Sequence, residues 1–239
     1  MSFELFVAAR YLRAKRKTRF ISIVTVISVL GVMTGVAALI IAMAINNGVQ
    51  QDLQRHLLSA TAHVNLLEKE PGFGMESWRP MVAEMEQIDH VEAVAPALYG
   101  QVMISTPIRG QGCVIKGIDP AREVEVADLL KNLDEGSLND LIQPPGSLPG
   151  IIVGRRLADT IGARLQTEVA LLNPQGEITP FGMMPVRKRY RVVGIFDSGF
   201  YEYDSTWTYT TLEAAQQTLA IDDVINAIEF RLDDLEQAE

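Results

Sequence analysis

One uninterrupted apolar segment divides the chain into two unequal parts. Residues 20–45, FISIVTVISVLGVMTGVAALIIAMAI, contain no charged side chain. As an α-helix they would be about 39 Å long, which exceeds the roughly 30 Å hydrocarbon core of a bilayer. The pattern therefore predicts one transmembrane helix over 20–45. The alternative is a cleaved secretory signal with Ala42-Met43-Ala44 as its cleavage site, although the apolar part of a signal is typically only about 7–15 residues long.

The two flanks of this segment also show helical spacing. Residues 1–19 begin with FELFVAARYL and end in a basic cluster, so we expect a short interfacial helix and a basic leader. Residues 46–60 are polar, but Val49, Leu53 and Leu57 recur at intervals of four. The helix is therefore expected to continue beyond the membrane as a stalk.

The remaining residues alternate between short strands and short helices. A strand over 62–67, a helix over 77–88 with Ser77 as N-cap candidate, and strands over 91–105 and 111–118 form the first part. A helix near 126–132 follows, and residues 198–205 are expected to form a turn. The fold class predicted is α+β. Its segments are 61–120, 121–224 and a return strand within 225–239, the middle one containing the strands IIVG, EVALLN, RYRVVGIF and TWTYT and the helices RRLADTIGA and LEAAQQTL.

Charge assigns a direction to the membrane segment. Residues 1–19 carry six Lys and Arg residues against Glu4, whereas the whole chain has a net charge of −9. Basic residues flank transmembrane helices on the cytoplasmic side. We therefore expect a cytoplasmic N-terminus and an acidic body on the opposite side, which is a membrane topology and does not indicate nucleic-acid binding.

Motifs for catalysis or metal binding are missing from the sequence. It has no phosphate-binding G-x-x-x-x-G-K-[ST] loop and no G-x-S-x-G nucleophile elbow. His56, His63 and His90 are scattered, and Cys113 is the only cysteine and is expected to be a small buried hydrophobe. We expect a protein without catalytic residues, metal ligands or a cofactor of its own.

The apolar segment carries small residues at helical spacing. Gly31 and Gly35 form a G-x-x-x-G pattern, which Ala38 and Ala42 continue along the same face. Small side chains let a second membrane helix approach closely. This face is expected to pack against a partner helix.

The stretch NPQGEITPFGMMPV, residues 173–186, is predicted to be a loop because its prolines and glycines break any regular pattern. Pro180 and Pro185 would stiffen it, and Met183 and Met184 offer an adaptable apolar surface. Arg187, Lys188 and Arg189 follow directly. The residues alone leave two interpretations open: a hairpin tip folded back onto its domain, or a surface that contacts another protein.

Several motifs together resemble a known family. The leader LFVAARYLRAKRKTRFISIVTVISVLGVMTGVAALIIAMAINNGVQQDL, and then VIKGIDP, VGRRLADTIGA, VVGIFDSGFYEYDSTWTYTTLEAAQQTL and IEFRLDD, are similar to the LolC/LolE lipoprotein-releasing permeases of the MacB/FtsX-like ABC transporter superfamily. The resemblance implies a MacB-like periplasmic domain made of a porter-like part and a β-rich sabre-like part. The porter-like part is expected to be incomplete here, and three further membrane helices of the family are not found in this chain.

The same resemblance implies a function and a set of partners. The chain would be a bacterial inner-membrane permease subunit that releases outer-membrane-directed lipoproteins to a periplasmic carrier. A second permease subunit and a cytoplasmic ATPase, which would bind ATP and Mg, would complete the transporter. Rival interpretations are a permease of the superfamily for efflux or cell-division signalling, and a single-span periplasmic sensor or binding protein.

The resemblance also assigns three functional sites of the family to residues of this sequence. Carrier binding is implied for a loop and for a basic patch beside it, and a lipid-substrate cleft for the outer part of the membrane helix. The loop is Thr179, Pro180, Phe181, Gly182, Met183, Met184 and Pro185; the patch is Arg187, Lys188 and Arg189; the cleft residues are Ile40, Met43, Asn46 and Asn47. Asn46 and Val49 depart from a Met-Asn-Gly-Phe sequence that relatives often have near the outer leaflet.

Overall fold

The structure is a computed structural model that describes residues 6, 7, 10, 19–60, 62–69, 72, 74–179 and 182–233. For residues 19–22, 49–60, 177–179, 182 and 183 it describes the backbone alone. The interfacial helix predicted within 1–19 falls almost entirely outside the described residues. The chain divides into two compact units, Met1–Arg55 and His56–Glu239.

The first unit contains most of a long helix, α2 (Arg19–Ala60). Its stretch Ile23–Gly48 is long and apolar enough to cross a membrane, and all of its side chains are exposed. A helix that is apolar on every side is stable only when lipid or other protein surrounds it. Thr34 fits such surroundings because its hydroxyl donates to the Leu30 carbonyl at 2.8 Å, so this hydroxyl is paired within the helix.

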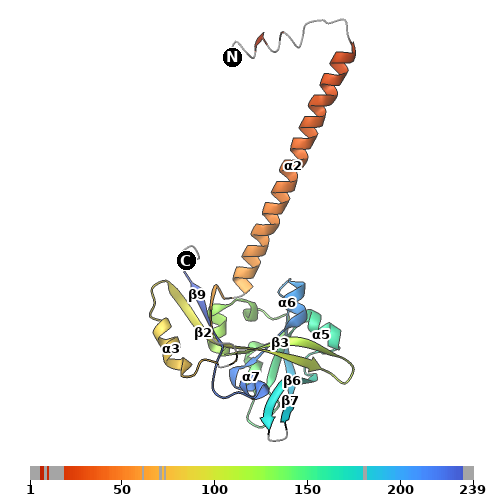
Figure 1. Ribbon diagram of the computed structural model, residues 1–239. Coiled ribbons are helices and arrows are strands. Elements are labelled where there is room, and N and C mark those ends of the chain that lie inside the picture. The colour runs from red at the N-terminus through yellow and green to blue at the C-terminus, as the bar shows by residue number, and fades with distance from the viewer. Residues whose placement is uncertain are drawn as a thin grey trace. The chain divides into compact units, whose positions relative to one another are not determined.

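The second unit is built on a nine-stranded sheet. Its strands are β1 (Val64–Leu67), β2 (Val91–Ser105), β3 (Gly110–Ile118), β4 (Glu135–Gly136), β5 (Gly150–Gly154), β6 (Glu168–Thr179), β7 (Gly182–Phe196), β8 (Trp207–Thr211) and β9 (Ala227–Leu232). They lie in the order β1-β9-β2-β3-β8-β5-β7-β4, and β6 pairs with both β2 and β7. The pairings β2-β3-β8-β5-β7-β6-β2 therefore close a ring of strands (Figure 1).

Short helices cover parts of this sheet: α3 (Trp78–Met85), α4 (Pro120–Val126), α5 (Arg155–Ile161), α6 (Tyr201–Thr206) and α7 (Leu212–Leu219), with 3-10 turns η1 (Leu129–Lys131) and η2 (Leu138–Leu141). The start of α4 is fixed by Asp119, whose side chain accepts from the amide of Ala121, and by Pro120 in the first turn. Ser77 is the N-cap of α3, as predicted, although it adopts a left-handed φ of 52° and its side chain makes no cap hydrogen bond. Two local predictions were wrong. Residues 126–132 contain only the last residue of α4 and the short turn η1, and the predicted turn over 198–205 contains α6.

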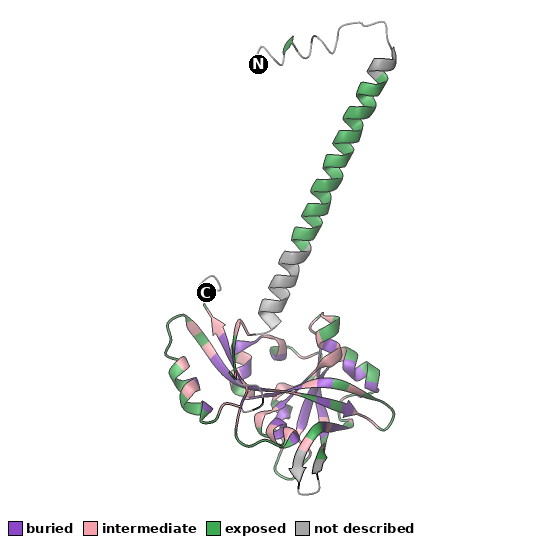
Figure 2. Ribbon diagram, viewed as in Figure 1, coloured by how far each residue is buried: buried purple, intermediate pink, exposed green. Residues whose placement is uncertain are grey.

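Three apolar clusters form the core of the second unit. The largest joins inward-facing residues of β2, β3, β5, β6 and β7 to α5 and α7. A second lies on the other side of β5, β7 and β8 under η1 and η2, and a third fixes α3 on β2 and β9. Buried residues accordingly concentrate in the middle of the sheet in Figure 2. Cys113 belongs to the largest cluster, as predicted, and burial raises the pKa of its thiol to about 12.

Strand β9, near the end of the described residues, pairs with the first strand of the body. It lies between β1 and β2 and runs antiparallel to both, with Phe230 opposite Val64 and Val94. The strand thus joins the elements predicted for 61–120 in one sheet. The proposed division of the body into 61–120, 121–224 and 225–239 stays a prediction.

Candidate functional site

The stretch predicted to be a loop is a long β-hairpin formed by β6 and β7. At the base of the hairpin, the paired residues run from Glu168 and Arg191 to Asn173 and Val186. In its outer part, they run from Glu177 and Met184 to Thr179 and Gly182. The hairpin extends outward from the ring in Figure 1. The prediction of an irregular loop over 173–186 was wrong because its prolines occupy positions that a sheet tolerates. Pro174 and Pro185 lie at the irregularity between the two sets of pairs, where a missing N–H is not needed.

A bulge that requires a glycine at position 176 separates the base of the hairpin from its outer part. Gly176 has a φ of +53°, and a Cβ built there would lie 2.0 Å from the carbonyl oxygen of Met184. Asn173 is 3% exposed and fixes the bulge: its side-chain amide donates to the Leu219 carbonyl at 3.0 Å, and its side-chain oxygen accepts from the Gln175 amide at 3.1 Å. The outer hairpin is therefore attached to the end of α7.

The predicted contact residues lie at the outer end of this hairpin. Met184 is 58% exposed and Pro185 is exposed, so these two side chains do not fold back onto the domain. Thr179, Gly182 and Met183 are placed by their backbone in the last pairs. Pro180 and Phe181 lie outside the described residues.

The three basic residues do not share a face. Arg187 and Arg189 alternate with Lys188 along β7, so they point to opposite sides of the hairpin. Arg187 and Arg189 are exposed, and Arg189 lies 3.7 Å from Glu168. Lys188 instead donates to the side chain of Gln217 on α7 at 2.9 Å. The face that could meet a partner thus carries Arg187 and Arg189.

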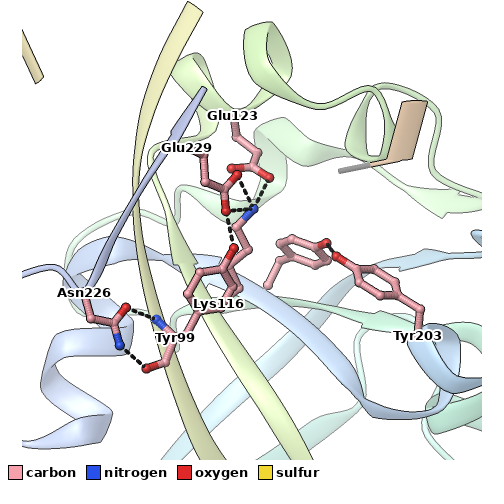
Figure 3. A network of polar contacts seen from close by, with 7 residues as sticks. Tyr99, Lys116, Glu123, Tyr203, Asn226 and Glu229 are labelled. Atoms are coloured by element: carbon pink, nitrogen blue, oxygen red, sulfur yellow. Dashed lines mark hydrogen bonds and ion pairs between the residues drawn. The ribbon is translucent and has the colours of Figure 1, made fainter. Parts of the chain in front are cut away.

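A buried cluster of charges lies where β3, α4 and β9 meet (Figure 3). The ammonium of Lys116 lies 2.6 Å from the Glu123 carboxylate and 2.8 Å from that of Glu229. The Tyr99 hydroxyl also donates to Glu229, and Asn226 exchanges two 2.8 Å hydrogen bonds with the backbone of Tyr99. The cluster joins strands β2, β3 and β9 to α4.

The charges of this cluster do not balance, because one ammonium lies between two carboxylates. Burial raises the pKa of Glu123, and the charge of Lys116 only partly offsets this rise. One oxygen of Glu123 has no partner among the described residues. Burial by itself lowers the pKa of Lys116, but the two carboxylates outweigh it and the pKa lies well above its ordinary value.

Sequence reasoning missed this cluster. Its signal is a lone charge inside an apolar strand, as in VIKGI and AIEF. Aromatic rings complete its surroundings: Tyr203 stacks on Trp207 with centroids 4.5 Å apart and shares a hydrogen bond with Tyr209. The cluster is buried, and it joins β2, β3, β9 and α4. Among the described residues, no group of three or more His, Cys, Asp or Glu side chains could hold a metal ion.

The candidate residues of α2 fall on different faces of that helix. Gly31, Gly35, Ala38 and Ala42 recur every three or four positions and so form one stripe. Ile40, Met43 and Asn47 lie on roughly the opposite side, with Asn46 between the two sets. A Cβ at Gly31 or Gly35 would meet nothing within 4 Å. The stripe is thus free to receive a second helix.

Comparison with known proteins agrees with these observations. Residues 25–239 match the family described as MacB-like periplasmic core domain. The chain belongs to this family. This confirms the α+β organisation with one apolar N-terminal helix before a MacB-like periplasmic domain, and the resemblance to LolC/LolE permeases.

Named relatives extend the comparison. The chain is 30% identical over 240 residues to the lipoprotein-releasing system transmembrane protein LolC of Neisseria meningitidis, covering 99% of this chain and 56% of that protein. It is 32% identical to LolC of Xylella fastidiosa (97% and 54%) and 22% identical to LolE of Haemophilus influenzae (98% and 56%). The chain thus spans about half the length of these curated relatives. Among solved structures, the extracellular domain of the transporter YknZ from Gram-positive bacteria has a TM-score of 0.46 at 12% identity, covering 66% of this chain and 74% of that one.

Proposed function

We propose that this chain acts within a permease subunit of an ABC transporter that releases lipoproteins from the bacterial inner membrane to a soluble periplasmic carrier. The observation that carries the proposal is the outward β6–β7 hairpin, with exposed Met184 and Pro185 at its outer end and Arg187 and Arg189 on one face. The names of the curated relatives, which are transmembrane proteins of lipoprotein-releasing systems, support it.

The proposal assigns roles to the two units. Helix α2 sits in the membrane with its N-terminal side in the cytoplasm, its small-residue stripe packs against another helix, and Ile40, Met43, Asn46 and Asn47 face a lipid-accessible cleft. The body lies in the periplasm and presents the hairpin, residues 179–185, to the carrier. The chain itself contributes contacts and no catalytic group.

Transport requires partners that supply energy. Moving lipid chains out of a bilayer costs about 0.8 kcal/mol for each buried methylene group. We assign the energy source to a cytoplasmic ATPase that binds ATP and Mg, and the second wall of the cleft to another permease subunit, identical or distinct. The lipoprotein is the substrate.

Carrier binding tests the role of the hairpin. Met183→Asp combined with Met184→Asp should abolish capture of the purified carrier while the thermal unfolding temperature of the body changes little, because Met184 is exposed. The measurement is pull-down of the carrier, with thermal unfolding of the same samples. A wild-type protein that does not bind the carrier would contradict the proposal and favour an efflux permease or a sensor. A fall in stability comparable to a core substitution would show that the methionines pack inward.

A further inference from the structure

The buried charge cluster contains three ionisable side chains whose full charges would not cancel. The ammonium of Lys116 points between the carboxylates of Glu123 and Glu229 (Figure 3). Both glutamate side chains are 1% exposed, and that of Lys116 is 5% exposed. If all three were ionised, one negative charge would remain uncompensated in the interior, where burial of a charge is strongly unfavourable.

The two carboxyl groups receive unequal numbers of hydrogen bonds. Both oxygens of Glu229 accept from Lys116, at 2.8 and 2.9 Å, and one of them also accepts from the Tyr99 hydroxyl. Within the described chain, Glu123 accepts from Lys116 alone, through Oε1 at 2.6 Å, and its buried Oε2 atom has no partner. Hydrogen bonds to a carboxylate favour its ionised form. Glu229 is therefore the group that stays ionised, and Glu123 is the group that is better neutral.

The other titratable groups that face the cluster do not supply a charge. They are the phenol groups of Tyr99 on β2, Tyr203 on α6 and Tyr209 on β8. Burial raises the pKa of each of the three above its ordinary value. All three hydroxyls are thus neutral near pH 7 and change nothing in the balance of charges around Glu123.

The nearest cations on α4 and β9 are engaged by other carboxylates. Arg122, next to Glu123 in sequence, pairs with Glu86 at the surface. Arg231 on β9 lies 3.1 Å from Asp128. In the part of the chain that the structure describes, neither arginine forms an ion pair with Glu123, so the charge of this carboxylate would have to share Lys116 with Glu229.

The attachment of α4 to the sheet depends on the same side chain. Glu123 and Val126 are the two buried residues of this seven-residue helix. The ion pair between Arg122 and Glu86 is partly exposed and contributes little, because water screens it. The protonation state of Glu123 therefore decides how firmly α4 is held.

We propose that Glu123 is a proton-binding site: its carboxyl group is neutral in the folded body at pH 7, with the proton on Oε2, and loss of this proton loosens α4 from β3 and β9. With the proton bound, the buried charges of Lys116 and Glu229 cancel. A neutral hydroxyl without a partner is less unfavourable in the interior than a bare carboxylate oxygen, because burial penalises a charge more than a dipole. The proton passes to water when α4 opens, so the attachment of α4 follows the pH around the body.

Infrared spectroscopy of the detergent-solubilised full chain at pH 7 tests the protonation, because the carbonyl stretch of a carboxylic acid is separate from the bands of a carboxylate. The wild type should show an acid band that Glu123→Gln removes and that Glu86→Gln, at an exposed carboxylate, retains. Tyr99→Phe removes the hydroxyl that donates to Glu229, so the band should keep its position if the proton is on Glu123. Identical acid bands in wild type and Glu123→Gln, or a band that shifts in Tyr99→Phe, would overturn the proposal.

Hydrogen exchange tests the effect on α4. The amide of Glu123 donates to the Asp119 carbonyl and that of Ala127 to the Glu123 carbonyl, both at 2.9 Å. After correction for the intrinsic effect of pH on exchange, the opening constant of both amides in the wild type should rise by up to about tenfold for each pH unit until Glu123 ionises, because the open state releases the proton. In Glu123→Gln it should not change with pH. Wild-type opening that is independent of pH would overturn the proposal, whether or not the Glu123→Gln variant folds.

Discussion

Lys116 is the side chain on which the buried charge cluster depends. Its 5% exposed side chain is the only cation within 4 Å of Glu123 or Glu229 among the described residues. Removing one member of a buried ion pair leaves an uncompensated charge and typically costs about 3–5 kcal/mol. The cluster also joins residues that are 113 positions apart in the chain. It therefore fixes β9 and α4 onto β3 and helps to hold the body as one unit.

Glu123 should make the stability of the body depend on pH. Its pKa is raised above 4.5, so the folded state binds more protons than the unfolded state between pH 4.5 and the folded pKa. This contribution to the free energy of unfolding is full below pH 4.5 and is lost as pH rises, by at most about 1.4 kcal/mol for each pH unit. Glu123→Gln should abolish it. The stability of the wild type relative to this variant should therefore fall as pH increases.

The measurement is urea unfolding of the detergent-solubilised protein between pH 4.5 and 8, followed by the fluorescence of Trp78 and Trp207, which both lie in the body. Glu86→Gln is the control, because Glu86 is a surface carboxylate, 44% exposed, that pairs with Arg122. A difference between wild type and Glu123→Gln that stays constant with pH would contradict the raised pKa.

The hairpin formed by β6 and β7 combines a rigid base with a separately held outer part. The base is fixed by the core, where the Tyr190 hydroxyl donates to the Ala214 carbonyl at 2.7 Å. The outer part depends on the bulge at Gly176 and on Asn173. A contact segment built in this way keeps its direction before the partner arrives, and this lowers the entropy lost on binding.

Gly176→Ala should open the outer hairpin and leave its base intact. The new Cβ would collide with the carbonyl of Met184, and a φ of +53° is unfavourable for alanine. Hydrogen exchange of the amides at 177–179 and 182–184 should accelerate at least about tenfold, whereas the amide of Tyr190 should be unaffected. Gly112→Ala, at an open position, is the control. Unchanged exchange in the outer segment would show that the bulge does not hold it.

Elements with a strong local pattern could be predicted from the sequence, and elements made by distant contacts could not. The membrane helix follows from 26 uncharged residues, and most strands follow from alternation and β-branched residues. The strand pairing within 173–186 was missed because Pro174 and Pro185 suppress local strand propensity, while pairing across the hairpin overrides it. That Arg187 and Arg189 point away from Lys188 could be seen only once the residues in strand β7 were known. The ion pair of Lys116 with Glu229 could be seen only in the three-dimensional structure, because the two residues are far apart in the sequence.

The two units of the molecule meet different surroundings. All described side chains of Ile23–Gly48 are exposed and apolar or small, except for a few hydroxyl and amide groups, so this part is stable in lipid. The body has its own apolar clusters and an acidic composition, which suit a water-filled compartment. We propose that the body lies in the periplasm and that its hairpin touches a soluble carrier.

The most direct test is photo-crosslinking in living cells from a photoreactive residue placed at position 184. We expect a covalent adduct between this position and the periplasmic carrier, and none from the same residue at position 88, where the exposed Ile88 lies near the end of α3. The absence of a carrier adduct from position 184 in membrane-inserted protein, or adducts with cytoplasmic proteins instead, would contradict it.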